Sequence, residues 1–268
     1  MSAIPDLDIA RERAFLNLLA DGAREAILPH FRVGTPTENK GAGAFDPVTE
    51  ADRGAERAIR ALIAQHRPEA GIEGEEYGAS PSRNGWTYVL DPVDGTRAFI
   101  SGLPLWGCLI GLCFEETPVF GVLDQGYLGE RFIGFPGGAV LVDAAGERPL
   151  RARPCAGLET ATIATTDPDL FTAAEAPAYR AVRQRARLAR LGCDCYAYGM
   201  VALGGIDLVI ESGLKRHDIA ALVPIVSGSG GLVSDWRGGP AGMGGQVIAA
   251  GDAQAHAEAL ALLAPAAL

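Results

Sequence analysis

"YVLDPVDGTRAFISGLP", residues 88–104, carries an apolar run into two aspartates, Asp91 and Asp94, that stand directly before a glycine and a threonine. Aspartate, proline and glycine favour turns, so one interpretation is a simple turn that ends a buried strand. The other interpretation is a metal site, because one turn can aim both carboxylates at a single point with the Val93 carbonyl between them. Two carboxylates about 4 Å apart repel by roughly 4 kcal/mol at an effective dielectric constant near 20, and a cation removes that penalty.

The ligand type indicates which ion such a site would bind, and the next two residues indicate which reaction it would serve. Oxygen ligands alone select hard ions such as Mg²⁺ or Mn²⁺ rather than zinc. Gly95 and Thr96 are predicted to begin a short helix, whose first N–H groups are suited to bind phosphate. A metal cluster beside a phosphate site is the equipment for phosphoryl transfer to water.

The bulk composition indicates a globular protein of one large domain or two subdomains with a shared core. The chain has 268 residues, of which 48% are apolar and 21% charged. Its 23 basic and 33 acidic side chains give 23 − 33 = −10, which argues against nucleic acid or an anionic membrane as the main partner. Neither a signal peptide nor a membrane span is expected. Five cysteines without zinc-site spacing favour buried thiols in a reducing cytoplasm.

Hydrophobic spacing predicts two helices at the start of the chain, over 8–31 and 49–68, separated by a loop over 34–47. Residues 86–142 change to short β-rich runs broken by glycine, which predicts a largely antiparallel sheet. After residue 142, predicted strands alternate with predicted helices. A polar, turn-rich stretch near 145–160 marks a soft boundary between two subdomains. Strands are expected at 161–166, 186–192, 206–212, 232–236 and 246–251, and helices at 174–187, 195–205, 218–231 and 253–264.

This organisation predicts two subdomains that form one compact catalytic unit. Residues 1–150 would be an α+β subdomain with most of the metal ligands and the phosphate site. Residues 151–268 would be an α/β subdomain that supplies Asp218 and the substrate-side residues.

Acidic residues gather in four places, and each place also has a purely structural interpretation. Asp52 fits a capping box with Thr49, Asp218 can cap the helix that follows it, and a "GEE" pair can lie in a solvated loop. Because these acidic residues occur together with the 88–104 turn, a separate structural explanation for each of them is less convincing than one shared site. The four groups are Asp46 and Asp52, Glu75 and Glu76, Asp91 and Asp94, and Asp218.

These motifs, "TEAD", "GEE", "DPVDGT" and a downstream aspartate that opens a helix, resemble in type and order the inositol monophosphatase family of metal-dependent sugar phosphatases. The resemblance spans roughly residues 10–260. It implies a layered αβαβα sandwich, α+β in its first half and α/β in its second, with the metals at the junction. It also implies Mg²⁺ as the cofactor, as two ions or three if a weaker site is filled, with Mn²⁺ as an alternative.

Within the family, "DGTRAFISGLPLWG" and "CDCYAYGMVALGGIDLVIESGLK" look most like the histidinol-phosphatase branch. Inositol monophosphatases typically carry "DGTTNFVHGFP" and a tryptophan directly before the downstream aspartate, where this chain has Arg97 and His217. The chain's histidines lack the spacing of metal ligands, and His217 is interpreted as the neighbour of a helix cap.

The resemblance also implies roles for single residues. Those similar to the family's Mg²⁺ ligands are Glu75, Asp91, the Val93 carbonyl, Asp94 and Asp218. Asp52 and Thr96, assisted by Glu75, would position and deprotonate a water for in-line attack on phosphorus. The N–H groups of Gly95 and Thr96 would hold phosphate oxygens.

Four further residues are candidates for substrate binding, each with an alternative. Arg97 can approach the phosphate or be a surface helix residue, and Arg190 can contact substrate or form a salt bridge at a strand edge. Asp194 and Glu211 would suit a substrate with a cationic amine and an imidazole, although Asp194 can also be a loop turn.

The sequence therefore predicts a cytoplasmic, homodimeric, Mg²⁺-dependent phosphomonoesterase. Its expected reaction is hydrolysis of L-histidinol phosphate to histidinol and phosphate in histidine biosynthesis. The first alternative is the same chemistry on inositol 1-phosphate or with broad specificity, and the bisphosphate branches come next. A metal-binding scaffold without activity is the alternative from another class.

Overall fold

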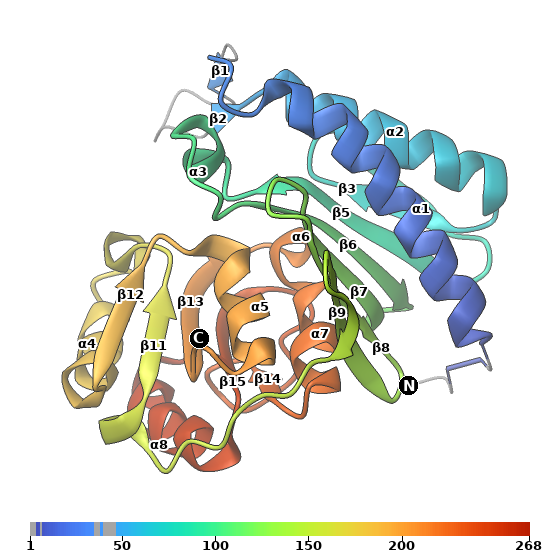
Figure 1. The fold of residues 1–268 in the computed structure, drawn as a ribbon. Coiled ribbons are helices and arrows are strands. Elements are labelled where there is room, and N and C mark those ends of the chain that lie inside the picture. Colours follow the sequence, from blue (N-terminus) through green and yellow to red (C-terminus); the bar gives the residue numbers. More distant parts are fainter. Residues whose placement is uncertain (1–3, 6, 35–37, 40–46) are drawn as a thin grey trace.

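The computed structural model describes residues 4–5, 7–34, 38–39 and 47–268. These residues form five layers in the order helices, sheet, helices, sheet, helices (Figure 1). The αβαβα sandwich predicted from the sequence is thereby confirmed. Asp46 and most of the predicted 34–47 loop lie outside the described residues.

Two amphipathic helices make the first layer. Helix α1 (Ile9–Ile27) begins at Asp8, whose side chain accepts from the Arg11 N–H at 3.1 Å, and Pro29 turns its end into a short 3₁₀ helix (Leu28–His30). Helix α2 (Glu50–His66) begins at Thr49 with the predicted capping box. Their apolar faces pack against each other and against the larger sheet.

In the described part of the chain, eight strands form the larger sheet, in the order β10-β9-β8-β7-β6-β5-β3-β4. From β5 to β10 it is an antiparallel meander, as predicted, whereas β3 pairs with β5 in parallel. Short strands β3 and β4, next to the "GEE" motif, were not predicted. The strands are β3 (Gly71–Gly74), β4 (Gly78–Ser80), β5 (Trp86–Asp94), β6 (Gly107–Phe114), β7 (Thr117–Gln125), β8 (Glu130–Phe135), β9 (Gly138–Asp143) and β10 (Gly146–Pro149). A separate pair joins β1 (Glu38–Asn39) to β2 (Pro47–Val48).

The central helices lie between the two sheets (Figure 1). They are α5 (Asp194–Leu203), α6 (Arg216–Ile219) and α7 (Leu222–Gly228), whereas the short α3 (Thr96–Ile100) lies at the end of the larger sheet, beside the β1–β2 pair (Figure 1). Helix α7 approaches the larger sheet so closely that a Cβ atom on Gly121 or Gly134 would collide with the α7 segment's backbone. Glycines in β7 and β8 are thus required by packing rather than by backbone conformation.

Five strands of the described chain form the second sheet, in the order β12-β11-β13-β15-β14. Strand β11 pairs in parallel with β12 and β13, and β15 runs antiparallel to both of its neighbours. Helices α4 and α8 cover its outer face (Figure 1). The elements are β11 (Thr162–Thr165), α4 (Ala176–Arg185), β12 (Leu188–Leu191), β13 (Leu208–Leu214), β14 (Leu232–Ser234), β15 (Gly245–Ala250) and α8 (Ala253–Leu263).

The prediction of one continuous helix over 218–231 is wrong. The segment 218–231 is divided between α6 and α7. Pro224 explains the division, because it has no N–H to donate to the carbonyl four residues earlier, at Ala220. Asp218 therefore lies on α6, a separate short helix before α7.

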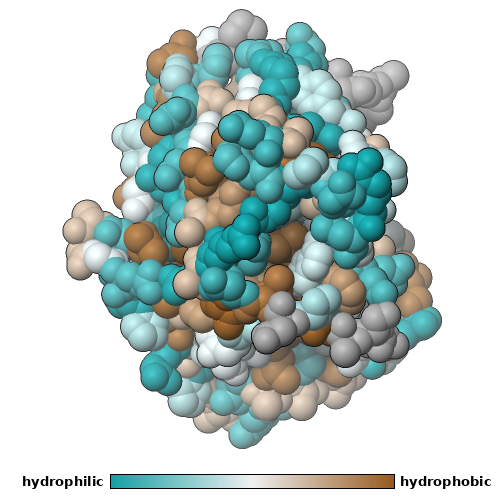
Figure 2. Space-filling model, turned by 90° about the vertical axis from the view of Figure 1, so that its right-hand side faces the viewer, coloured by the Kyte–Doolittle hydropathy of each residue, from teal (hydrophilic) through white to brown (hydrophobic). Residues whose placement is uncertain are grey.

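The hydrophobic residues of the surface and the cysteines of the core are arranged as the composition predicts. Hydrophobic residues appear on the face shown in Figure 2 as small patches among hydrophilic ones. All five cysteines are buried free thiols. Among the described residues, no helix has the length and apolar character needed to cross a membrane.

Candidate active site

The end of β5 forms the centre of the site. Its pairing with β6 shifts register between Asp91 and Asp94, so the strand bulges where the two aspartates stand. Asp91 is buried, and its Oδ1 accepts the Val93 N–H at 3.1 Å. Gly95 has φ of 80°, a left-handed conformation that glycine adopts readily, and this turns the chain into α3. The Thr96 hydroxyl donates to the Val93 carbonyl at 3.0 Å.

Glu75 reaches the same point from the turn after β3. Its N–H donates to the Leu90 carbonyl at 3.2 Å, which holds it beside β5. The buried carboxylate of Glu56 accepts the N–H of Glu76 at 2.7 Å and the N–H of Tyr77 at 3.2 Å. A Cβ on Gly74 would collide with that carboxylate. Glu56 is a positioning residue that the sequence analysis missed, and the only signal for it was the glycine before "EE".

Asp218 belongs to the second half of the chain and lies on α6. Its Oδ2 accepts the Lys215 N–H at 2.7 Å, and its Oδ1 faces the His217 ring nitrogen Nε2 at 3.4 Å. Arg216 fixes the helix to the larger sheet through its Nη1, which lies 2.8 Å from Glu73 Oε2. Glu73 and Arg216 each stand two residues before a predicted metal ligand, so this ion pair joins the two ligand-bearing segments directly.

The structure brings four of the predicted ligands into two overlapping groups that share Asp91, and it adds His217, which was not predicted as a ligand. One group is Glu75, Asp91 and His217, and the other is Asp91, Asp94 and Asp218. In each, one ligand atom per residue lies within 4.8 Å of the others. Each group would supply three ligand atoms to a cation, and Asp91 belongs to both groups.

The electrostatics of the cluster fit divalent cations. Burial, followed by the charges of Glu75, Asp94 and Asp218, raises the pKa of Asp91 well above its ordinary value. The pKa of Asp94 is raised well above its ordinary value mainly by burial. Such carboxylates resist ionisation until a cation compensates their charge, and hard oxygen ligands suit Mg²⁺. The donor set therefore fits the metal that the sequence predicts.

Asp52, at the start of α2, lies beside this cluster. Its Oδ2 accepts from the Thr49 N–H at 2.8 Å and from the Thr49 hydroxyl at 2.7 Å. Its Oδ1 is buried without a hydrogen-bond partner among the described residues. Burial, opposed by the bonds from Thr49 and assisted by the charge of Glu75, raises the pKa of Asp52. One oxygen of this residue is held by the helix cap, and the other is available to a ligand.

The second half of the chain supplies the opposite wall. The Cys195 N–H donates to Asp94 Oδ2 at 2.8 Å. Asp194 precedes it in a left-handed conformation (φ 43°), and burial raises its pKa to about 6 against the opposing charge of Arg97. Burial raises the pKa of Glu211 to about 7, although Thr165 and Thr166 donate to it at 2.8–3.2 Å.

These groups line one narrow cavity of about 20 Å³. Its lining residues are Asp94, Thr166, Asp194, Cys195, Tyr198, Glu211, Leu214, Asp218 and Leu222. The Tyr198 hydroxyl is buried without a partner in the described residues. Tyr198 and the threonines were not predicted as site residues, because nothing in their spacing distinguishes them from core positions.

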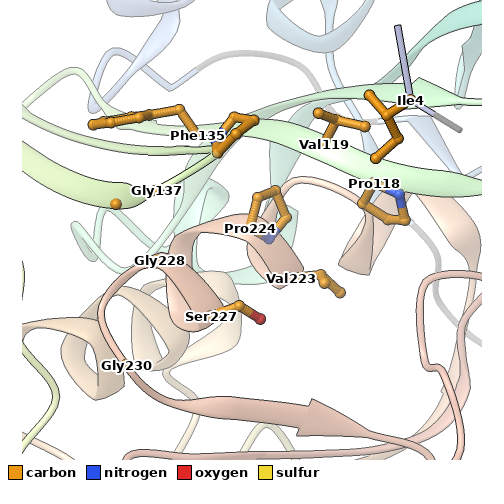
Figure 3. Close-up of a pocket in the computed structure, with 12 residues that line it drawn as sticks. Ile4, Pro118, Val119, Phe135, Gly137, Val223, Pro224, Ser227, Gly228 and Gly230 are labelled. Carbon is orange, nitrogen blue, oxygen red and sulfur yellow. The ribbon is translucent and has the colours of Figure 1, made fainter. Parts of the chain in front are cut away.

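The two predicted substrate-side arginines are both exposed. Arg97 is on α3, close enough to Asp194 to affect its pKa, whereas Arg190 is on the edge strand β12 and outside the cavity's lining. A larger apolar groove of about 480 Å³ lies elsewhere, between α7 and strands β7 and β8 (Figure 3). The described residues that line it include no acidic side chain. The carboxylate cluster is therefore the better candidate for phosphoryl chemistry.

Comparison with known proteins agrees with the geometry of the cluster. The family model described as "Inositol monophosphatase family" matches residues 9–267. The chain belongs to this family. Its members are phosphatases, of the class of phosphoric monoester hydrolases, and are metal-dependent, typically on Mg²⁺.

Several relatives of this family member are known. The chain is 39% identical to the bifunctional phosphatase IMPL2, chloroplastic, of Arabidopsis thaliana, over 97% of this chain and 77% of that protein. It is 34% identical to a histidinol-phosphatase of Chlorobaculum parvum over 87% of each chain. A solved structure of an inositol monophosphatase from Zymomonas mobilis superposes with a TM-score of 0.85 at 40% identity, covering 96% of this chain and 99% of that one.

Proposed function

We propose that this phosphatase hydrolyses L-histidinol phosphate to L-histidinol and phosphate, with Mg²⁺ as its cofactor. The observation that carries the choice of substrate is a pair of carboxyl groups beside the candidate metal cluster, those of half-buried Asp194 and buried Glu211, with pKa values near 6 and 7. A cationic amine or imidazole offers both groups a charged partner on binding. The hydroxyl groups of an inositol ring offer them hydrogen bonds only.

Each residue of the site has a proposed task. Glu75, Asp91, Asp94, Asp218 and the Val93 carbonyl hold the ions. Bound divalent ions would lower the pKa of a water and neutralise charge on phosphate. Asp52, through its available Oδ1, accepts the proton of the attacking water, and the Thr96 hydroxyl, 3.0 Å from the Val93 carbonyl, helps to position it. The N–H groups of Gly95 and Thr96 receive phosphate oxygens, with Arg97 at the rim.

Relatives support the choice of substrate without deciding it. Three of them, from Chlorobaculum parvum, Mycobacterium tuberculosis and Streptomyces coelicolor, are histidinol-phosphatases at 30–34% identity. An inositol-1-monophosphatase of Mesorhizobium japonicum is 31% identical over 84% of this chain. Together with the Zymomonas mobilis structure, it makes inositol 1-phosphate the second candidate substrate.

The test compares kcat/KM for L-histidinol phosphate and inositol 1-phosphate on the full chain with saturating Mg²⁺. We expect a preference for histidinol phosphate of at least about 10-fold, the range that one well-placed polar subsite supplies. A preference for the inositol ester would overturn the substrate assignment. The same assay after removal of divalent ions with EDTA should give no phosphate release, and re-addition of Mg²⁺ should restore it. A protein that released no phosphate from any small phosphomonoester would instead be a metal-binding scaffold.

A further inference from the structure

His217 lies inside the metal cluster rather than beside it. One of its ring nitrogens is within 4.8 Å of carboxylate oxygens of both Glu75 and Asp91. Its side chain is only 11% exposed. The nearest acceptor, Asp218 Oδ1, lies 3.4 Å from Nε2, which is longer than the roughly 2.7–3.2 Å of a good N–H···O hydrogen bond. Among the described residues, the imidazole makes no hydrogen bond that would account for this buried position.

The neighbouring residues hold the imidazole in place. Arg216 precedes it, with Nη1 2.8 Å from Glu73 Oε2 and Nη2 3.2 Å from the Glu115 carbonyl. Asp218 follows it, with Oδ2 bonded to the Lys215 N–H at 2.7 Å. Arg216 therefore ties the segment of His217 to strand β3, directly before the Glu75 turn, and the bond between Asp218 and Lys215 caps the short helix that carries the ring. The ring does not depend on a flexible loop to reach the cluster.

We infer that His217 supplies a nitrogen ligand to the ion held by Glu75 and Asp91, so that the two ion positions differ in donor type. The position of Glu75, Asp91 and His217 combines nitrogen with oxygen, whereas the position of Asp91, Asp94 and Asp218 is made of oxygen alone. Transition ions from Mn²⁺ to Zn²⁺ accept imidazole beside carboxylates, whereas Mg²⁺ prefers oxygen and keeps its waters. The mixed position is therefore selective for a transition metal.

This inference rests on the proposed function only in that both require the carboxylate cluster to bind cations. A physiological consequence follows for the choice of ion. One Mn²⁺ would bind at the mixed position at concentrations at which Mg²⁺ fills the all-oxygen position. The protein would then work with a mixed pair of ions, and its activity in Mg²⁺ alone would rise on addition of a trace of Mn²⁺.

The direct test is pulsed EPR of the full-length wild-type protein loaded with less than one equivalent of Mn²⁺, without substrate. Two samples are compared, one unlabelled and one with ¹⁵N-labelled histidine. We expect a nitrogen coupling to Mn²⁺ that changes with the histidine label. Since the wild-type protein is used, the result does not depend on whether a variant folds. Mn²⁺ bound without any histidine coupling would overturn the inference.

Two variants assign the coupling and measure its effect on affinity. His217→Phe, or His217→Gln if the phenylalanine variant does not fold, should lose the coupling. Calorimetric titration should then show Mn²⁺ binding weakened by about 10–100-fold, with a smaller change for Mg²⁺. His66→Phe, at an exposed histidine on α2, is the matched control and should change neither. An equal loss of Mn²⁺ and Mg²⁺ affinity in the His217 variant would contradict selectivity by the imidazole.

The phosphatase assay separates this inference from the proposed function. Phosphate release with Mg²⁺, together with bound Mn²⁺ that has no histidine coupling, would refute the inference and leave the proposed function standing. A histidine-coupled Mn²⁺ in a protein without phosphatase activity would support the inference and refute the proposed function.

Discussion

The N–H of Cys195 donates to Oδ2 of Asp94 at 2.8 Å, across 101 residues of sequence. Asp94 is therefore a member of the metal cluster and a partner of the first turn of α5 at the same time. Since Asp194 is the first residue of that helix, the bond fixes the wall that carries Asp194 relative to the carboxylate cluster. A change at Asp94 should consequently affect both metal binding and substrate position.

Asp94→Asn should abolish hydrolysis while leaving the protein folded. The amide can still accept from Cys195, but the lost charge removes a ligand that Asp91 and Asp218 cannot replace. We expect kcat/KM and Mg²⁺ affinity to fall by at least about 100-fold, measured by phosphate release and calorimetric titration. Thermal unfolding in EDTA should be unchanged or shifted upward, because repulsion within the cluster is relieved. Exposed Asp169→Asn is the control, and retained activity in Asp94→Asn would refute the metal assignment.

Asp52→Asn should lower kcat much more than it lowers Mg²⁺ affinity. The substitution removes a proton acceptor at Oδ1 but keeps an oxygen for the Thr49 cap. Loss of a general base costs about 10²–10⁴-fold in kcat. Asp8→Asn alters the N-cap aspartate of α1, outside the cluster, and should leave kcat unchanged. A drop in Mg²⁺ affinity as large as the drop in kcat would mean that Asp52 acts as a ligand instead.

Asp194→Asn should reduce discrimination between the two candidate substrates. Asparagine tolerates the left-handed conformation at this position, so the backbone is preserved while the negative charge is lost. We expect kcat/KM for histidinol phosphate to fall about 10–100-fold, with little change for inositol 1-phosphate. Parallel progress curves with both esters measure this. Equal losses on both substrates would assign Asp194 to the phosphate or the metals rather than to the amine.

Glu211→Gln should change how stability depends on pH. The folded-state pKa of Glu211 is raised from 4.5 to about 7, so the folded protein binds more protons than the unfolded chain between these values. The wild-type free energy of unfolding therefore falls as pH rises through this window, by on the order of 3 kcal/mol from this residue. The glutamine variant should lack this decline and gain relative stability at pH 8.

Urea denaturation of both proteins at pH 5 and pH 8 provides the measurement. The substitution of exposed Glu159 by glutamine is the control for loss of a charge elsewhere. Parallel stability curves for the wild type and Glu211→Gln would contradict the raised pKa.

Gly121→Ala should destabilise the fold without touching the site chemistry. The added methyl group would collide with the Ala221 backbone, so α7 would have to move away from β7. We expect a loss of roughly 1–3 kcal/mol or more by chemical denaturation. Gly138→Ala adds a methyl with only ordinary contacts to Phe135 at 3.5 Å and serves as its control. Equal stabilities of the two variants would refute the close-packing interpretation.

Several features of this protein are determined locally and are visible in the sequence. The capping box of Thr49 and Asp52, the bulged turn at Asp91 and Asp94, and the meander from β5 onward depend on residues near one another in the chain. The order of the acidic motifs indicated the family, which the family model confirms, and it supplied the candidate ligands. Pro29 and Pro224 were visible signals as well, because each lacks an N–H, although neither was used to end or divide a predicted helix.

Other features depend on contacts between distant segments, and no local spacing predicts them. The inclusion of His217 in the cluster depends on the Arg216–Glu73 ion pair, which spans 143 residues. Glu56 holds the Glu75 turn from 20 residues away, and Arg190 came to an exposed strand edge. The pKa values of Asp194 and Glu211 arise from burial, which exists only once the two sheets enclose α5. The sequence by itself determined the family and offered most of the candidate ligands for metal and phosphate, because those ligand types are fixed by chemistry. Only the tertiary structure decided which of them meet, because their approach depends on how the layers pack.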